Sequence, residues 1–349
     1  MWQVAVIGGG PAGCAAAHEA ARLGLPGIVI ERGEPHRDKA CGDMLVPNAA
    51  AVLKEFGLQL KDDGPGSRFS AVELHGRERL LWRVTYPDEP VWIVPRRILD
   101  QLLRDALPEE MNVLHSGSVT SVSRAGDDLL ELSVRLSHGQ TIQLRSRTVI
   151  IAAGAQSPIA RDWGLSGRGY IAPSISAYLQ GIATPVPKFE FRRRSIPGYR
   201  WVFPLSGRLG NLGICSLARA NGSTLRTLGD ELAAEHGIAP ERVRWRGGAG
   251  SLWSGQGTTW HHEAGVLSCG DAAGLVDPVN GEGITAALVS GRAAATAIYD
   301  FLRSGRSPSV LSGYSAWVRA MFSARYAHTP VRTVWRRLCG DRRLEEAAA

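Results

Sequence analysis

The stretch that decides the fold is residues 4–31, VAVIGGGPAGCAAAHEAARLGLPGIVIE. A short apolar strand at 4–7 leads into a glycine-rich turn, an alanine-rich helix is expected over 15–23, and a second strand follows at 27–31. Gly8, Gly10 and Gly13 match the pattern G-x-G-x-x-G. The first glycine allows the tight turn, the second lets a pyrophosphate approach the backbone, and the third lets the helix pack closely on the strand. The pattern predicts a βαβ unit that binds a dinucleotide.

The ligand contacts expected of this unit involve a few further residues. A diphosphate is favoured at the helix N-terminus, where free N–H groups and the helix dipole attract negative charge, and Ala12 lies in that turn. Glu31 ends the second strand, where its carboxylate can accept hydrogen bonds from ribose hydroxyls. Arg32 follows directly and is expected to belong to the same site.

Length and charge limit the function classes. The chain has 349 residues, of which 44% are hydrophobic, so it can bury a large core, and two closely packed domains are expected. The net charge is +7, but the arginines are dispersed, so no nucleic-acid partner is predicted. A basic surface that faces anionic lipid or an anionic partner stays open.

Cysteine usage and hydropathy indicate the compartment. Five cysteines at irregular spacing, without a C-x-x-C pair, predict neither a disulfide framework nor a metal site, and they favour the reducing cytoplasm. No cleavable leader is expected, because the sequence MWQVAVIGGG enters the first strand directly. No membrane span is expected, because no window approaches 18 uninterrupted apolar residues. The tail from Leu311 carries Trp317, Phe322 and Trp335 and is interpreted as a helix that packs its aromatic residues on the body. A helix at a membrane surface is the alternative, so peripheral membrane contact is allowed.

The rest of the chain divides into two kinds of segment. Strands and helices typical of an α/β domain are expected over residues 1–75, 95–157 and 262–305. Residues 76–94 and 158–261 are rich in Pro, Trp, Gly and Arg, with short antiparallel strands, and are interpreted as an inserted substrate domain. Residues 306–349 form a C-terminal helical segment. We therefore predict an α/β protein with a discontinuous nucleotide-binding domain.

Two further stretches indicate which dinucleotide is bound. CGDAAGLVDPVNGEGITAALVSGRAAA at 269–295 and VPRRILDQLL at 94–103 follow the glycine turn in a fixed order. Together the three motifs resemble the superfamily of flavoprotein monooxygenases and geranylgeranyl reductases. The resemblance implies the fold of p-hydroxybenzoate hydroxylase, in which a Rossmann-like FAD-binding domain is interleaved with a substrate domain built on an antiparallel sheet.

The resemblance also implies roles for individual residues. Asp271 would bind the ribityl chain of FAD, and Gly281, Gly283 and Ile284 would bring backbone to the isoalloxazine ring. A helix N-terminus there would stabilise negative charge on the reduced flavin. Arg96 would lie near the diphosphate or the ribityl chain, with Arg97 as the competing candidate. The backbone of Val119 would pair with adenine.

Two short segments indicate the branch of the superfamily. KACGDML at 39–45 resembles the Lys-x-Cys-Gly segment of geranylgeranyl reductases, and YRWVFP at 199–204 resembles their Tyr-x-Trp-x-Phe-Pro pattern. The resemblance implies that Gly42 lets the backbone approach the flavin ring and that Cys41 faces the substrate, either as a proton donor or as a pocket wall. Tyr199 and Trp201 lie two residues apart on a strand and so share one face, where they are expected to line the substrate cavity.

Several reactions are compatible with these residues. The leading hypothesis is hydride transfer between flavin N5 and a carbon–carbon bond of a hydrophobic substrate, such as an isoprenoid or a polycyclic or aromatic natural-product intermediate. The alternatives are a monooxygenase or halogenase that uses a flavin C4a-hydroperoxide, and a non-catalytic FAD-binding partner protein. Ala153 stands where the family usually has an aspartate, which weighs against a simple aromatic hydroxylase. NAD(P)H, a separate reductase or ferredoxin, or the substrate itself would supply electrons, because no second G-x-G-x-x-G is present.

Overall fold

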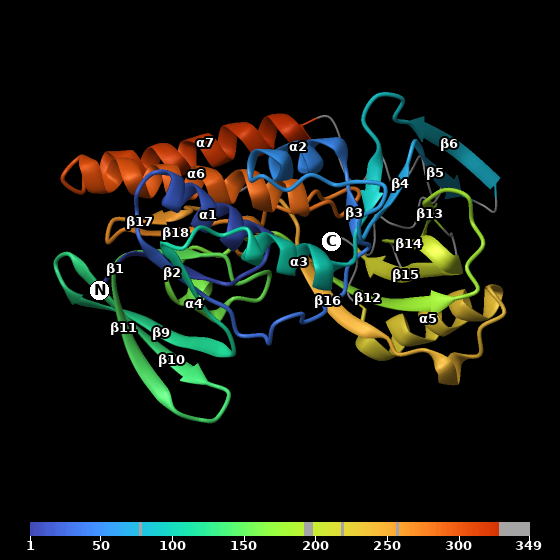
Figure 1. Ribbon diagram of the computed structural model, residues 1–349, viewed down its shortest axis with the longest axis horizontal. Coiled ribbons are helices and arrows are strands. Elements are labelled where there is room, and N and C mark those ends of the chain that lie inside the picture. The colour runs from blue at the N-terminus through green and yellow to red at the C-terminus, as the bar shows by residue number, and fades with distance from the viewer. Residues whose placement is uncertain (77–78, 192–197, 218–219, 256–257, 328–349) are drawn as a thin grey trace.

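The computed structural model describes residues 1–327 except 77–78, 192–197, 218–219 and 256–257. Two large sheets lie side by side, one at the β1 end and one at the β14 end of Figure 1. Trp335 and the remaining predicted tail at 328–349 fall outside the described residues.

The first sheet is built on the predicted βαβ unit. Its parallel strands run in the order β18 (Val266–Ser268), β11 (Thr141–Ile151), β1 (Trp2–Ile7), β2 (Gly27–Ile30) and β8 (Met111–Leu114). The antiparallel β17 (His261–His262), β10 (Leu129–Leu136) and β9 (Gly117–Gly126) complete it. Helix α1 (Pro11–Arg22) begins earlier than the predicted residue 15. Proline suits the first helical turn because its fixed φ is helical and the missing N–H would have no partner there.

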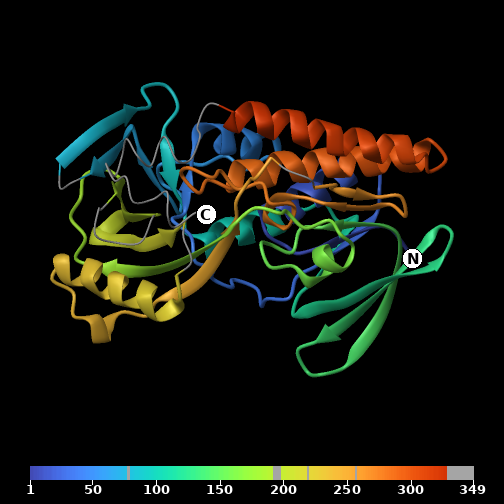
Figure 2. The same ribbon diagram turned by 180° about the vertical axis from the view of Figure 1, so that it is seen from behind.

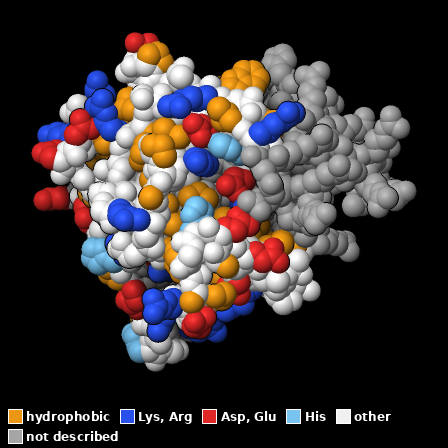
Figure 3. Space-filling model, turned by 90° about the vertical axis from the view of Figure 1, so that its right-hand side faces the viewer, with side chains coloured by type: hydrophobic (Ala, Val, Ile, Leu, Met, Phe, Trp, Pro, Cys, Tyr) orange, Lys and Arg blue, Asp and Glu red, His pale blue; other side chains and the backbone are white. Residues whose placement is uncertain are grey.

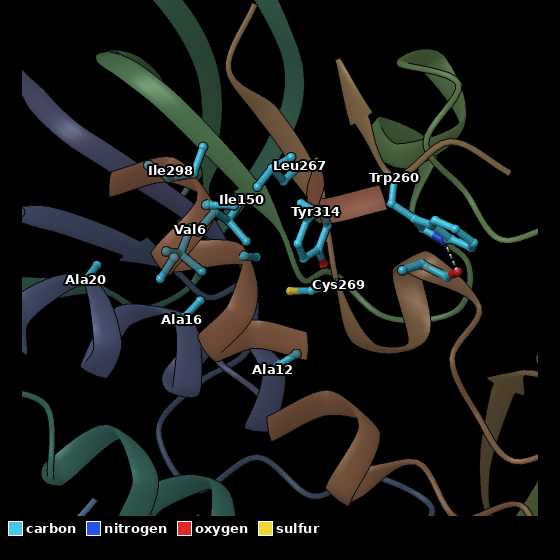
Figure 4. Close-up of a cluster of buried hydrophobic side chains, with 14 of the residues drawn as sticks. Val6, Ala12, Ala16, Ala20, Ile150, Trp260, Leu267, Cys269, Ile298 and Tyr314 are labelled. Carbon is cyan, nitrogen blue, oxygen red and sulfur yellow. Dashed lines mark hydrogen bonds between the residues drawn. The ribbon is translucent and has the colours of Figure 1, made fainter. Parts of the chain in front are cut away.

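Helices α6 (Ile284–Arg303) and α7 (Pro308–Tyr326) run along one side of this sheet (Figure 1). Gly291 of α6 lets α1 come close, because a Cβ at this position would lie 2.1 Å from the carbonyl oxygen of Ala12. The core between these elements is shown in Figure 4, where the Trp260 indole donates a hydrogen bond of 2.8 Å to the Ala273 carbonyl. Phe322 is buried and Trp317 is partly buried against this core. The aromatic residues of the described tail therefore pack on the body, as predicted.

The second sheet has seven strands and two unlike faces. Its order is β16 (Arg246–Ser251), β12 (Ile171–Gln180), β15 (Leu209–Ser216), β14 (Gly198–Pro204), β13 (Lys188–Phe191), β5 (Ala71–Gly76) and β6 (Arg79–Thr85). All neighbours are antiparallel except β13 and β5. Aliphatic residues of one face pack on α5 (Gly222–Glu235), which lies along the sheet in Figure 2. The other face carries a cluster of aromatic side chains.

The remaining elements lie around and between the two sheets. A small sheet combines β3 (Met44–Leu45), β7 (Val91–Ile93) and β4 (Ser67–Phe69). The other helices are α2 (Pro47–Glu55), α3 (Arg96–Asp105), α4 (Pro158–Asp162), and the 3-10 turns η1 (Ser206–Arg208), η2 (Pro240–Arg242) and η3 (Gly270–Ala273). No helix in the described ranges is both long and apolar enough to span a bilayer.

Two of the predicted domain boundaries differ from the arrangement of strands and helices in the structure. The boundary at residues 75/76 falls inside β5, which pairs with β6 and β13 and so belongs to the seven-stranded sheet. Ile159 and Ala160 of α4 pack in the core of the parallel sheet, although the predicted substrate domain begins at residue 158. Strand pairing of β5 and core packing of α4 therefore place these segments across the predicted boundaries, and the division as a whole stays a prediction.

Candidate functional site

Two adjoining cavities lie between the sheets. The larger, of about 1250 Å³, follows the carboxyl ends of the parallel strands and is here called the channel. The smaller, of about 630 Å³, lies against the aromatic face of the second sheet and is called the chamber. Residues that line both are Pro11, Lys39, Ala40, Arg96, Ala249, Asp271 and Ala287. Ligands of open α/β sheets bind at this edge, so the joined cavities are the candidate site.

The glycine turn lines the channel, and each of its glycines has a different constraint. Gly8 has φ of +105° and lies against the Ala152 carbonyl, while a Cβ on Gly13 would lie 1.8 Å from the Gly8 carbonyl oxygen. Gly10 is different, because the atoms nearest to a Cβ there are guanidinium nitrogens of Arg96 and Arg37, at 3.9 and 4.0 Å. Gly10 therefore faces open space between two positive charges, at the N-terminus of α1. Ala12 also lines the channel.

Glu31 already has partners in this structure. Its two carboxylate oxygens accept hydrogen bonds from the backbone N–H groups of Gly9 (2.8 Å) and Gly33 (2.7 Å), and Arg37 donates to both oxygens at 2.7 and 3.1 Å. Burial opposes ionisation, but Arg37 and these N–H groups hold the pKa of Glu31 below its ordinary value. Glu31 thus fixes the glycine turn and Arg37, and its predicted contact with ribose stays a prediction. Sequence reasoning missed Arg37, since nothing in its spacing marks it.

The far end of the channel holds the two remaining candidates from the adenosine side. Arg32 is exposed at its rim, and Val119 lines its wall beside Gly117 and Ser118.

Arg96 stands where the channel meets the chamber. Its side chain is buried and makes a bidentate ion pair with Asp100 through hydrogen bonds of 2.8 and 3.0 Å. Burial alone would lower the pKa of Arg96, but the charge of Asp100 raises it above its ordinary value. Arg97 is exposed, with its guanidinium carbon 6.0 Å from the centre of the Tyr178 ring. Of the two competing arginines, only Arg96 lines the cavities.

The motif at 269–295 forms the opposite wall of the junction. Asp271 lines both cavities, with its carboxylate 3.7 Å from the Lys39 ammonium. Gly281 has φ of +70°, and a Cβ there would lie 2.2 Å from the Tyr199 hydroxyl. Gly283 precedes α6 as its N-cap residue, and Ile284 is the first helical residue. Both line the chamber.

The chamber is lined mainly by aromatic and aliphatic side chains. Tyr199, Trp201 and Phe203 share one face of β14, and the ring centroids of Tyr199 and Phe203 lie 5.5 and 5.0 Å from that of Phe189. The polar groups of Tyr199 and Trp201 both have hydrogen-bond partners. The Tyr199 hydroxyl donates to the Asn280 carbonyl (2.7 Å), and the Trp201 indole donates to the Asn211 amide oxygen (2.9 Å). The structure thus places Tyr199 and Trp201 on the chamber wall.

The KACGD segment forms the wall next to these rings. Cys41 lines the chamber, and burial raises the pKa of its thiol although Arg96 acts in the opposite direction. A Cβ on Gly42 would lie 2.7 Å from the Phe203 ring and 3.6 Å from the Trp201 indole nitrogen. The missing side chain of Gly42 therefore leaves room for the aromatic rings. Its predicted approach to a flavin ring is not tested by this contact.

Asp43 is a site residue that sequence reasoning missed. It is fully buried at the chamber wall, with φ of +64°. Tyr178 and Asn211 each donate to its Oδ2 at 2.6 Å, and the Arg96 backbone N–H donates to Oδ1 at 3.2 Å. Burial outweighs these donors and raises the pKa of Asp43 to about 7. Asp43, Tyr178 and Asn211 come from distant segments of the chain. The register of β12 and β15 sets Tyr178 opposite Asn211, and both side chains then reach Asp43.

No cluster of three His, Cys, Asp or Glu side chains that could hold a metal ion occurs among the residues that the structure describes.

The Arg96–Asp100 pair gives a testable stability difference between adjacent arginines. In Arg96→Met the Asp100 carboxylate stays buried without its bidentate partner, and Arg37, at 3.7 Å, compensates only in part. We expect the free energy of unfolding to fall by about 3–5 kcal/mol. Arg97→Met, at the exposed neighbour, is the matched control and should change it by less than about 0.5 kcal/mol. Urea denaturation measures both, and equal losses would contradict the assignment.

Comparison with known proteins identifies the family. Residues 1–200 match the model of the FAD binding domain family, and residues 181–327 match the tryptophan halogenase model. The menaquinone reductase of Mycolicibacterium smegmatis is 32% identical over 90% of this chain and 78% of its own length. The digeranylgeranylglycerophospholipid reductase of Thermoplasma acidophilum is 25% identical over 93% and 85%.

Solved structures share the fold. A geranylgeranyl bacteriochlorophyll reductase-like protein from Thermoplasma acidophilum superposes with a TM-score of 0.80 at 23% identity, over 93% of this chain and 84% of that one. The p-nitrophenol 4-monooxygenase of Pseudomonas putida gives 0.79 at 17% identity, over 100% and 92%. The predicted fold of p-hydroxybenzoate hydroxylase type is therefore confirmed.

The residues of the two cavities fit FAD. The channel offers a glycine turn, a helix N-terminus and two guanidinium groups for a diphosphate, and it opens into a chamber lined by aromatic rings. The chain belongs to the FAD-binding family of flavoprotein oxidoreductases and, within the FAD-dependent monooxygenase superfamily, to its geranylgeranyl reductase-like branch.

Proposed function

We propose that this FAD-dependent oxidoreductase adds hydrogen to, or removes it from, a carbon–carbon bond of an apolar isoprenoid substrate. The observation that supports this most is the chamber, whose wall is aromatic and aliphatic and which is continuous with the FAD channel. The names of two relatives, menaquinone reductase and digeranylgeranylglycerophospholipid reductase, refer to compounds with isoprenoid chains. Bound FAD would supply hydride chemistry at its N5 atom.

In this proposal the candidate residues hold FAD along the channel from end to end. Glu31, Arg32 and Val119 are at the adenosine end. The diphosphate would lie at the N-terminus of α1, between Arg37 and Arg96 and against the backbone of Gly8, Gly10, Ala12 and Gly13. Asp271 would take the ribityl chain. Gly42, Gly281, Gly283 and Ile284 would surround the flavin ring, and their position in the chamber wall supports this.

The chamber would hold the isoprenoid chain by contact and exclusion of water. Tyr199 and Trp201 present ring faces to it, while their hydroxyl and indole groups are already bonded elsewhere. They can therefore bind apolar groups without leaving a polar group unpaired. We propose that these two residues orient the substrate against the flavin and that Cys41 forms the adjoining wall.

A glycine substitution tests the proposed diphosphate position. Gly10 has φ of −87°, which alanine adopts readily, and a Cβ there meets no protein atom closer than 3.9 Å. Gly10→Ala should therefore fold like the wild type but lose at least about tenfold in FAD affinity, because the methyl group occupies the space of the diphosphate. Flavin fluorescence on titration of the apoprotein measures the affinity. Gly313→Ala, at an exposed glycine of α7 that has no positive φ and no protein atom within 4 Å of a Cβ and lies outside the channel, should keep FAD binding.

The reaction is tested on the purified flavoprotein with menaquinone and with a geranylgeranyl lipid. We expect the isoprenoid chain of the product to differ from that of the substrate by two hydrogens, measured by mass spectrometry of anaerobic reactions after any quinol has been reoxidised to the quinone. Dithionite, NADH, NADPH and a flavin reductase protein would each be supplied as reductant, which also identifies the electron donor. A product that forms only in air and gains oxygen, or a halogen when halide is present, would favour the monooxygenase or halogenase reading.

The halogenase reading has its own support in the match of residues 181–327 to the tryptophan halogenase model. The halogenase CmlS also shares the fold, with a TM-score of 0.73 at 24% identity over 93% of this chain and 62% of that one. Absence of turnover under every condition would favour the non-catalytic FAD-binding partner.

We also propose that peripheral membrane contact occurs at β6. Leu80, Leu81 and Trp82 are 49%, 37% and 69% exposed on this edge strand, and Trp82 also lines the chamber. Figure 3 views the β5–β6 end of the molecule and shows hydrophobic side chains gathered among basic and acidic ones. An apolar substrate would enter the chamber from lipid at this rim.

Vesicle binding tests this contact. Replacing both Leu80 and Trp82 by Ser should lower co-sedimentation with anionic phospholipid vesicles at least about threefold, because each exposed apolar side chain adds favourable transfer free energy. Met321→Ser, at a residue of α7 that is 42% exposed, is the matched control. Equal binding by the double variant and the wild type would rule out β6 as the contact.

A further inference from the structure

Asp43 is a buried acid whose hydrogen-bond donors are all neutral groups. Within the described residues its hydrogen-bond donors are the Tyr178 hydroxyl, the Asn211 amide and the backbone N–H of Arg96. The Arg96 guanidinium, the nearest positive group, is bonded to Asp100 instead. Such a carboxyl keeps a proton more readily than an ion-paired one. Its left-handed φ of +64° is a conformation that non-glycine residues adopt rarely, and one that is frequent at functional sites.

Tyr178 connects this acid with the outside. Its ring is partly exposed between the Arg97 and Arg246 guanidinium carbons, which lie 6.0 and 5.4 Å from the ring centre. Burial and the neighbouring Asp43 raise the pKa of Tyr178 far above its ordinary value, so the phenol stays protonated and donates. The partly exposed Tyr178 side chain is therefore joined directly to Asp43 at the chamber wall, by a hydrogen bond of 2.6 Å from its hydroxyl.

We propose that Tyr178 and Asp43 form the proton relay of the chamber, in which Asp43 gives the proton to a substrate carbon and Tyr178 restores it from solvent. The relay rests on the proposed function and deepens it. Saturation of a double bond requires a hydride and a proton. Bound flavin, once reduced by the electron donor, would supply the hydride with its electron pair.

Asp43 provides the proton, and Tyr178 and solvent replace it. The O–H bond of Asp43 breaks as a C–H bond forms at the neighbouring carbon, and Asp43 becomes a carboxylate. Tyr178 then passes its hydroxyl proton to that carboxylate and takes a proton from water. In the desaturation direction the Asp43 carboxylate accepts the proton and the same path releases it to solvent.

Two other acids of the chamber wall compete for this role. Cys41 lies beside Asp43, whose backbone N–H donates to its sulfur at 3.3 Å, but burial raises the pKa of the thiol above an already high value. Glu282 is partly buried with a raised pKa, yet its carboxylate accepts a hydrogen bond from the Thr285 N–H (2.6 Å) in the first turn of α6 and meets Arg325 at 3.3 Å. Burial raises the pKa of Asp43 to about 7, which suits general acid catalysis near neutral pH.

The kinetic test is single-turnover reduction of menaquinone or the geranylgeranyl lipid by pre-reduced holoenzyme across a pH series. Below about pH 7 the rate should be constant, and above it the rate should fall up to tenfold per pH unit as Asp43 loses its proton. Asp43→Asn should remove this fall in rate above pH 7, here called the alkaline limb, and should lower the rate by at least about a hundredfold. Cys41→Ala and Glu282→Gln should each keep the limb. Loss of the limb in either variant, or its retention in Asp43→Asn, would overturn the relay.

The variant Tyr178→Phe tests the role of Tyr178 in the relay separately from that of Asp43. The first turnover should keep its limb, shifted to higher pH, because the hydrogen bond from Tyr178 holds the pKa of Asp43 down. Later turnovers should slow at least about tenfold, because the carboxylate is no longer re-protonated through the phenol. Unchanged multiple turnover in Tyr178→Phe would remove Tyr178 from the relay.

A measurement without substrate separates the relay from the proposed function. The infrared C=O band of protonated carboxyl groups should lose intensity with a midpoint near pH 7, and Asp43→Asn should remove this change. The difference in unfolding free energy should agree. Between about pH 4 and 7 the folded state holds a proton that the unfolded state has lost, so the wild type loses stability relative to Asp43→Asn as pH rises. Absent turnover with this titration intact overturns the proposed function, whereas turnover without the titration overturns the relay.

Discussion

The close packing of α1 against β1 and α6 is the constraint on which the rest of the site depends. Gly13 removes a side chain where the helix meets the Gly8 carbonyl, and Gly291 does so where α6 meets the Ala12 carbonyl. With both contacts made, the N-terminus of α1 is held at the carboxyl edge of the parallel sheet. Its free N–H groups then open into the channel, and the carboxylate of Glu31 secures the same turn from the neighbouring strand. Backbone proximity, rather than any one charge, determines where the cofactor can lie.

Arg96 and the KACGD segment connect the two sheets into one site. The guanidinium of Arg96 is satisfied by Asp100 on its own helix, while its backbone N–H reaches Asp43. Asn211 of the second sheet donates to both the Cys41 carbonyl and the Asp43 carboxylate. The wall between channel and chamber is therefore held by hydrogen bonds from α3 and from the second sheet. A change in protonation at Asp43 would alter contacts on both sides of the site.

The features that sequence predicted are those encoded locally. The βαβ unit and the shared face of Tyr199 and Trp201 on β14 depend on short-range periodicity, and both are present. The start of α1 was misplaced because alanine content marks the helix interior and not its first turn. Arg37 and the Tyr178–Asn211–Asp43 contacts could not be foreseen, since they depend on loop conformation and on strand register between distant segments. Asp43 itself stood in a quoted motif, but its burial and its left-handed backbone are properties of the folded chain.

The parallel pairing of β13 with β5 has a consequence for synthesis of the protein. The β5–β6 hairpin leaves the ribosome early, but its neighbour β13 is made only after the whole middle of the parallel sheet has emerged. Until then the inner edge of β5 has no partner, and apolar residues of the hairpin are open to other chains. Nascent chains should therefore need protection by a chaperone between translation of Gly76 and of Phe191, and slow translation in this interval would favour aggregation.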